Sequence, residues 1–132
     1  MKGKLLHTMI RVVDLERAVR FYVDVLGMRE QRRKVLEKAD ATLVFLEDET
    51  GRHAIELTYN HDGRPYELGN QFGHFAFGVP DLDQARDDLA RRGVTFTRGP
   101  YTVSDGGSRI AFIRDPDGVE IELIEQAGRG AH

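Results

Sequence analysis

The sequence contains no cysteine, and no part of it approaches the roughly 20 consecutive apolar residues of a membrane-spanning helix. The absence of thiols excludes disulfides, thiolate nucleophiles and cysteine-ligated metals. The net charge is only −3 over 132 residues, so neither a nucleic acid nor a membrane is expected as a partner. The N-terminus shows no secretion signal. We therefore expect one cytoplasmic domain over residues 1–132, stabilised by packing, by assembly or by a metal with nitrogen and oxygen ligands.

What the sequence does contain is an internal repeat. Asp14 follows His7 by seven residues, and Asp81 follows His74 by seven residues, so the two copies lie 67 residues apart (74 − 7). Further pairs keep nearly the same offset: Ala18 with Ala85, Gly27 with Gly93, Phe45-Leu46 with Phe112-Ile113, Gly51 with Gly118, and Ile55-Glu56-Leu57 with Ile121-Glu122-Leu123. A colinear series that runs from a histidine to a glutamate in both halves predicts two equivalent modules.

Each copy is predicted to fold as a βαβββ module. In both, an alternating strand leads to an aspartate that can cap a helix, and a glycine ends that helix. Three strands follow, and the segment DPDG (residues 115–118) predicts a tight turn between the last two. The modules cover about residues 5–61 and 73–126, with a linker over 62–72. The expected strands are 7–13, 28–34, 42–47 and 54–60 in the first module, and 74–79, 94–98, 110–114 and 119–125 in the second.

A four-stranded sheet covered by one helix leaves a second face open, and polar residues fall on that face. Strand alternation places His7 there, together with Glu56, and the second module offers His74 and Glu122 at equivalent positions. A single histidine or glutamate in a strand is usually structural or solvent-exposed. Two such pairs at repeat-equivalent positions instead predict a divalent metal site, because imidazole and carboxylate suit Ni, Co, Fe, Mn and Zn.

At these residues the chain resembles a known family. The paired modules are similar to the vicinal oxygen chelate superfamily, which has the glyoxalase/bleomycin resistance/dioxygenase-like α+β fold. Within it the chain resembles bacterial glyoxalase I, from about residue 7 to about residue 125. The segments that carry this likeness are HTMIRVVD (7–14), FYVDVLGM (21–28), IELTYN (55–60), YELG (66–69), GHFAFGVPD (73–81) and DPDGVEIELIE (115–125).

The resemblance implies a lactoylglutathione lyase, a carbon–sulfur lyase that detoxifies methylglyoxal. Such an enzyme isomerises the hemithioacetal of methylglyoxal and glutathione to S-D-lactoylglutathione through proton transfer by a glutamate. By position the resemblance assigns the metal ligands as His7, Glu56, His74 and Glu122. It assigns Glu122 as the first choice of base and Glu56 as the second. It places Arg11, Thr58 and Asn60 at the γ-glutamyl end of glutathione; the alternative for Arg11 is a structural ion pair.

The same resemblance implies a homodimer with sites at its interface, in which one chain supplies His7 and Glu56 and the other supplies His74 and Glu122. The first ligand is His7, whereas zinc-preferring family members have glutamine there, so Ni(II) or Co(II) is expected, with Zn(II) as the alternative. Asn70 replaces an arginine of the eukaryotic forms, which leaves a thiol related to glutathione open.

Two other functions remain open at this stage. One is a different metal enzyme of the superfamily, an epimerase or a dioxygenase, although a dioxygenase would use two histidines and one carboxylate. The other is a drug-binding resistance protein, which would need no metal. The basic run of Arg29, Arg32, Arg33 and Lys34 is interpreted as a solvated strand edge.

Overall fold

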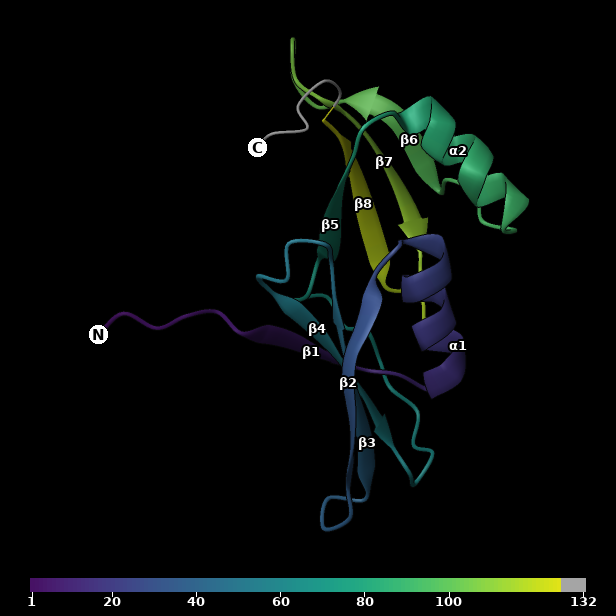
Figure 1. Ribbon diagram of the computed structural model, residues 1–132. Helices are drawn as coiled ribbons and strands as arrows, with labels where there is room; N and C mark the ends of the chain where they lie inside the picture. The colour runs from purple at the N-terminus through teal and green to yellow at the C-terminus, as the bar shows by residue number, and fades with distance from the viewer. Residues whose placement is uncertain (127–132) are drawn as a thin grey trace. The chain divides into compact units, whose positions relative to one another are not determined.

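The computed structural model describes residues 1–126, which form two units that meet at the Glu67/Leu68 boundary. That boundary lies inside the segment 62–72 that the sequence predicts as the linker. Each unit contains one four-stranded sheet and one helical segment (Figure 1). The α+β class and the two βαβββ modules are thereby confirmed. No helix in residues 1–126 is long and apolar enough to cross a membrane.

The first unit contains a sheet with the strand order β1-β4-β3-β2. Its strands β1 and β4 run parallel at one side, and the remaining pairs are antiparallel. Asp14 caps the helix by accepting a hydrogen bond from the backbone of Arg17, and Gly27 ends the helical segment with a φ of 74°. The elements are β1 (His7–Arg11), α1 (Leu15–Arg20), the π-helix η1 (Phe21–Val25), β2 (Arg29–Leu36), β3 (Ala41–Glu47) and β4 (Ala54–Asn60).

The second unit repeats this arrangement with the strand order β5-β8-β7-β6, again with a parallel outer pair. Asp81 accepts hydrogen bonds from the backbones of Asp83 and Gln84, as expected of the predicted cap. The predicted DPDG turn is also present, since the Gly118 amide donates to the Asp115 carbonyl at 3.0 Å. The elements are β5 (His74–Val79), α2 (Leu82–Arg91), β6 (Arg98–Thr102), β7 (Arg109–Arg114) and β8 (Glu120–Glu125).

The structure adds a detail to one local prediction and shows that another was wrong. The first helix does not continue as an α-helix beyond Arg20; it widens into the π-helix η1, where the Leu26 amide reaches back to the Phe21 carbonyl. The strand expected over 94–98 begins only at Arg98. The backbone amide of Val94 is bonded instead to the Leu89 carbonyl at the end of α2, so it is not free for a sheet ladder. The apolar alternation of that segment therefore reflects the exit from a helix.

The core of each unit lies on one side of its sheet. Leu57 and Ile121, which flank the glutamates in β4 and β8, are fully buried. In β1 and β5 exposure alternates along the strand, and the residues on the side of His7 and His74 are the exposed ones. Each sheet therefore has a packed face and an open face, and both predicted histidines lie on the open one.

Candidate metal centre and active site

The open face of the first unit carries a close His–Glu pair. His7 begins β1 opposite Ala54, and Glu56 lies in the middle of β4, two residues further along the parallel register. The His7 Nε2 atom lies 3.1 Å from Glu56 Oε1. The other carboxylate oxygen, Oε2, accepts a 2.8 Å hydrogen bond from the Thr58 hydroxyl. Glu56 is buried, and these two contacts engage both of its oxygens, as a buried carboxylate requires.

The second unit carries the equivalent pair with one difference. His74 begins β5, Glu122 lies in β8, and the Nε2 and Oε1 atoms of the two side chains are 3.0 Å apart. The residue that matches Thr58 in the repeat is Ile124, which has no hydroxyl. Within residues 1–126, His74 is accordingly the only polar side chain that contacts the Glu122 carboxylate.

Both pairs have the chemistry and the spacing of two neighbouring ligands on one divalent ion. Nitrogen and oxygen ligands lie about 2.1 Å from such an ion, so two of them at a right angle are about 3 Å apart. The imidazole side chains are 39% exposed, whereas the glutamate side chains are 11% and 16% exposed, so the nitrogen of each pair is open to an ion. Within the described residues no three ligand-type side chains gather at one point, and each unit therefore holds half of the predicted set.

The predicted substrate residues lie on the face of the first pair. Arg11 is the register partner of Thr58, and both share their face with His7 and Glu56. Arg11 is exposed, and no side chain in residues 1–126 forms an ion pair with it, which argues against the structural ion pair considered for it. Asn60 donates from its side-chain nitrogen to the Tyr66 hydroxyl at 2.5 Å. Thr58 is buried, and its hydroxyl is directed at Glu56 rather than at open space.

The sequence did not reveal the aromatic neighbours of the two histidines. The rings of His7 and Phe45 meet edge-to-face at 5.4 Å, and those of His74 and Phe112 do so at 5.6 Å. The two phenylalanines had been noted only as a matching pair in the repeat. The basic run lies on the exposed edge strand β2, as expected of a solvated edge, and the Arg32 guanidinium additionally stacks 4.1 Å above the Phe45 ring.

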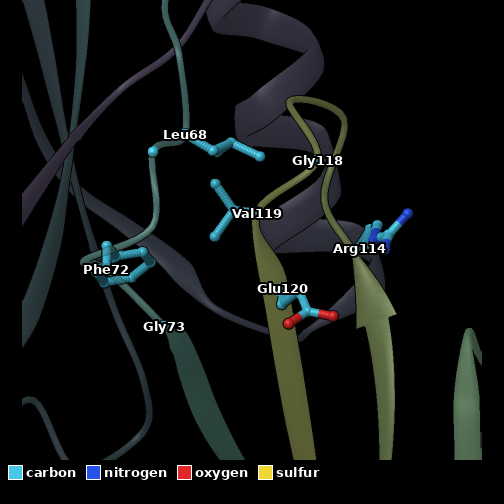
Figure 2. Close-up of a pocket in the computed structure, with 8 residues that line it drawn as sticks. Leu68, Phe72, Gly73, Arg114, Gly118, Val119 and Glu120 are labelled. Carbon is cyan, nitrogen blue, oxygen red and sulfur yellow. The ribbon is translucent and has the colours of Figure 1, made fainter.

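A cavity of about 420 Å³ lies in the second unit next to the start of β5. Apolar side chains of Leu68, Phe72 and Val119 lie on one side of it, and the charged side chains of Glu120 and Arg114 lie on the other (Figure 2). Gly73, which lines the cavity, immediately precedes His74, and the lining residue Glu120 is the register partner of His74, so the cavity lies at the strand end that carries this histidine. An amphipathic small molecule is the kind of ligand that such a lining accommodates.

Two βαβββ modules, each with one open sheet face, define the fold class of the chain. The family model described as Glyoxalase/Bleomycin resistance protein/Dioxygenase superfamily matches residues 4–123. The chain belongs to this superfamily. A lactoylglutathione lyase of Haemophilus influenzae is 45% identical over 124 residues, which cover 92% of this chain and 92% of that protein.

Solved structures give the same result. Glyoxalase I from maize superposes with a TM-score of 0.84 at 36% identity over 94% of this chain, which spans 45% of the maize chain. A trypanothione-dependent glyoxalase I from Leishmania major superposes with a TM-score of 0.78 at 37% identity, over 94% of this chain and 87% of the other. These likenesses confirm the expected family, and the expected lyase activity is the one named for these relatives.

Proposed function

We propose that the chain is a metal-dependent lactoylglutathione lyase that isomerises the hemithioacetal of methylglyoxal and glutathione. The observation that carries this proposal is the pair of His–Glu contacts at repeat-equivalent positions, with ligand atoms 3.1 Å and 3.0 Å apart. The relatives named lactoylglutathione lyase support the choice of reaction. A dioxygenase would leave the second glutamate without a role. A drug-binding protein would leave all four side chains without a role.

In this proposal His7, Glu56, His74 and Glu122 together hold one divalent cation. Two nitrogen and two oxygen donors without a thiolate fit Ni(II) or Co(II), and Zn(II) is the alternative. When bound, the cation supplies positive charge that stabilises negative charge developing on the substrate oxygens. The protein's part is to hold the four donors rigidly and to keep the carboxylates shielded from water, which the burial of Glu56 already achieves in the first unit.

Glu122 is the residue we propose to move the proton. It would remove the proton from the carbon bonded to sulfur and return it to the neighbouring carbon, while the hydroxyl proton passes to the neighbouring oxygen, so the isomerisation needs no other reactant. A hydrogen bond donated to a carboxylate occupies one of its oxygens and restrains its orientation. Glu56 accepts such a bond from Thr58, whereas Ile124 at the matching position offers none to Glu122. Glu122 is therefore the freer proton acceptor, and Glu56 is the more firmly held ligand.

Arg11 is proposed to bind the carboxylate at the γ-glutamyl end of glutathione, with Thr58 and Asn60 nearby. A guanidinium that forms no ion pair with any side chain in residues 1–126 is available to fork onto a carboxylate. The Thr58 hydroxyl already donates to Glu56, so its expected part in binding is as an acceptor or through its methyl group. Because the Leishmania relative is described as trypanothione-dependent, a thiol related to glutathione is an alternative co-substrate.

The active form is proposed to be a homodimer in which each site takes His7 and Glu56 from one chain and His74 and Glu122 from the other. The exposed faces of β1 and β5 support this arrangement. A sheet face that is open in a single chain is expected to pack against another layer, and a second chain can supply that layer. This chain spans 45% of the maize chain, so the maize chain is long enough to contain two copies of a chain of this size. We place the enzyme in the cytoplasm. The sequence has no cysteine, which is compatible with the reducing conditions of that compartment.

A steady-state assay tests the proposal directly. The protein is stripped of metal, reloaded separately with Ni(II), Co(II) and Zn(II), and supplied with methylglyoxal and glutathione while thioester formation is followed. We expect no activity without metal and the highest activity with nickel or cobalt. Higher activity with zinc would assign the chain to the other metal subclass. Thioester formation with none of the three metals would overturn the proposed function.

A further inference from the structure

The two open faces carry the same transverse row of side chains. In the first unit the register runs across the sheet from Arg32 on β2, through Phe45 on β3, to Glu56 on β4. His7 lies on the next strand, diagonal to Glu56. The row therefore consists of a cation at the edge, then an aromatic ring, then the carboxylate and the imidazole of the candidate metal centre.

The second unit has the same row of Arg98, Phe112 and Glu122, with His74 diagonal to the glutamate. The geometry repeats closely as well. The Arg98 guanidinium stands 3.9 Å above the Phe112 ring, against 4.1 Å in the first unit, and the edge-to-face angles between phenylalanine and histidine are 84° and 77°. The agreement between two independently packed sheets indicates a shared role rather than a chance contact.

An imidazole at the start of an exposed strand needs more than one contact to hold its orientation. In each pair the glutamate contacts the imidazole at Nε2, and this single contact does not fix the rotation of the ring. An edge-to-face contact with a phenylalanine restricts that swing, because aromatic pairs have a preferred geometry. Phe45 and Phe112 are themselves buried, and the stacked guanidinium closes the face of each ring.

We infer that Phe45 with Arg32, and Phe112 with Arg98, are positioning residues that fix the imidazoles of His7 and His74 for metal binding. The inference rests on the proposed metal centre and names the groups that pre-organise it. The aromatic ring sets the angle of each histidine, and the arginine keeps the ring in place. Metal-ligating histidines are commonly oriented by a hydrogen-bonded neighbour whose loss weakens metal binding about 10–100-fold, and we assign the same orienting part to the aromatic ring here.

The test measures cobalt binding to the full-length protein by chelator competition and records the visible absorption spectrum of the bound cobalt. Phe45→Leu and Phe112→Leu each remove a ring but keep an apolar side chain, and each should weaken cobalt binding at least about tenfold and alter the spectrum. Arg32→Met and Arg98→Met should have smaller effects, roughly two- to fivefold. Phe112→Tyr retains the ring and should restore the affinity lost in Phe112→Leu.

The matched controls are Phe96→Leu and Arg86→Met, because Arg86 stacks on Phe96 at 5.2 Å outside both His–Glu pairs. These controls should leave cobalt affinity unchanged. Unchanged affinity and an unchanged spectrum in folded Phe45→Leu and Phe112→Leu would overturn the inference.

Metal-free NMR separates this inference from the proposed function. In the wild-type protein without metal, the phenylalanine rings should shift the NMR resonances of the His7 and His74 imidazole protons by their ring currents. This displacement should disappear in the leucine variants. If the wild-type protein binds no metal but the displacement is present, the metal centre fails and the positioning stands. If metal binds but the displacement is absent, the positioning fails and the metal centre stands.

Discussion

The Thr58 hydroxyl donates a 2.8 Å hydrogen bond to Glu56 Oε2, while Glu56 Oε1 faces His7 Nε2 at 3.1 Å. The two oxygens of the Glu56 carboxylate thus contact two different side chains. In the other unit Ile124 stands in place of the threonine, and among residues 1–126 the Glu122 carboxylate contacts the side chain of His74 alone. Among the described residues the first carboxylate has two side-chain contacts and the second has one, and this asymmetry is the basis of the proposed ligand and base roles.

Replacing Thr58 should therefore weaken metal binding more than it slows chemistry. Thr58→Val keeps the shape of the side chain and removes the hydroxyl, so the Glu56 carboxylate loses its second contact. We expect cobalt or nickel affinity to fall about tenfold, with a smaller change in kcat at saturating metal. Thr8→Val is the matched control, because Thr8 contacts His53 on the opposite face of β1. Equal metal affinity in Thr58→Val and Thr8→Val would contradict this prediction.

The role of Glu122 as the base can be separated from its role as a ligand. Glu122→Gln keeps an oxygen donor but removes most of the basicity, so the variant should retain metal and lose roughly 10²–10⁴-fold in kcat. The measurement is steady-state turnover together with the metal content of the same sample. Glu56→Gln is the comparison, and the double variant should be worse than either single one. Near wild-type turnover by fully metal-loaded Glu122→Gln would show that Glu122 is only a ligand.

Arg11 should contribute to the binding of glutathione through a charge-assisted hydrogen bond. Arg11→Ala is expected to weaken the binding of an S-alkylglutathione by roughly 1–3 kcal/mol, measured by calorimetry with the metal-loaded protein. Asn60→Ala and Thr58→Ala should each cost less. Arg20→Ala serves as the control, because Arg20 is an exposed arginine at the end of α1. An affinity that is the same in Arg11→Ala as in Arg20→Ala would remove Arg11 from the binding site.

Subunit exchange tests the proposed sharing of ligands. His7→Ala and Glu122→Ala proteins should each be inactive, because each lacks one ligand in every site. If one chain supplies His7 and Glu56 while the other supplies His74 and Glu122, a mixed dimer has one intact site. Mixing the two variants should then restore part of the activity. No recovery, in a sample where mass spectrometry of the native assemblies proves exchange, would favour sites built within a single chain.

An acid-sensitive contact ties β2 to α1 in the first unit. Arg33 bonds Glu16 at 2.6 Å and also contacts Glu30, and this lowers the pKa of Glu16 while raising that of Arg33. Because the folded pKa of Glu16 is depressed, its stabilisation is present above the ordinary glutamate value of about 4.3 and is lost as the pH falls through the folded value. Glu16 is largely exposed, so the effect is small.

The corresponding experiment compares urea unfolding of the wild type and Glu16→Gln. At pH 7 the variant should be less stable by at most about 1 kcal/mol, and the difference should shrink in high salt. Below the folded pKa of Glu16 the two proteins should have equal stability. A difference that persists undiminished at such acidic pH would indicate that packing, rather than charge, connects Glu16 to Arg33.

The repeat in the sequence predicted the two modules because the spacing of the matching residues is nearly the same in both halves, although most other residues differ between them. His7, Glu56, His74 and Glu122 could be placed on open faces from strand alternation alone, and the structure brings them into two pairs. Their role as ligands remains a prediction. The strand over 94–98 was misplaced because alternation cannot distinguish a strand from a helix exit whose amide is already bonded.

The aromatic contacts were missed for a different reason. Arg32 and Phe45 are neighbours only through the register of β2 with β3, and that register includes an irregularity between Glu30 and Arg32. A bulge of this kind changes which side chains face each other without leaving a clear mark in the sequence. The direction of the Thr58 hydroxyl likewise depends on the side-chain geometry of Glu56, which strand periodicity does not determine.

Each His–Glu pair is formed wholly within its own sheet, and this arrangement bears on how the protein could have evolved. A duplicated ancestral module would have given two identical halves, each able to hold its own histidine and glutamate at the right separation. Substitutions in one half would then leave the other intact, so the copies could diverge one position at a time. Thr58 and Ile124 occupy matching positions in the two halves, and this one difference gives the two carboxylates unlike surroundings.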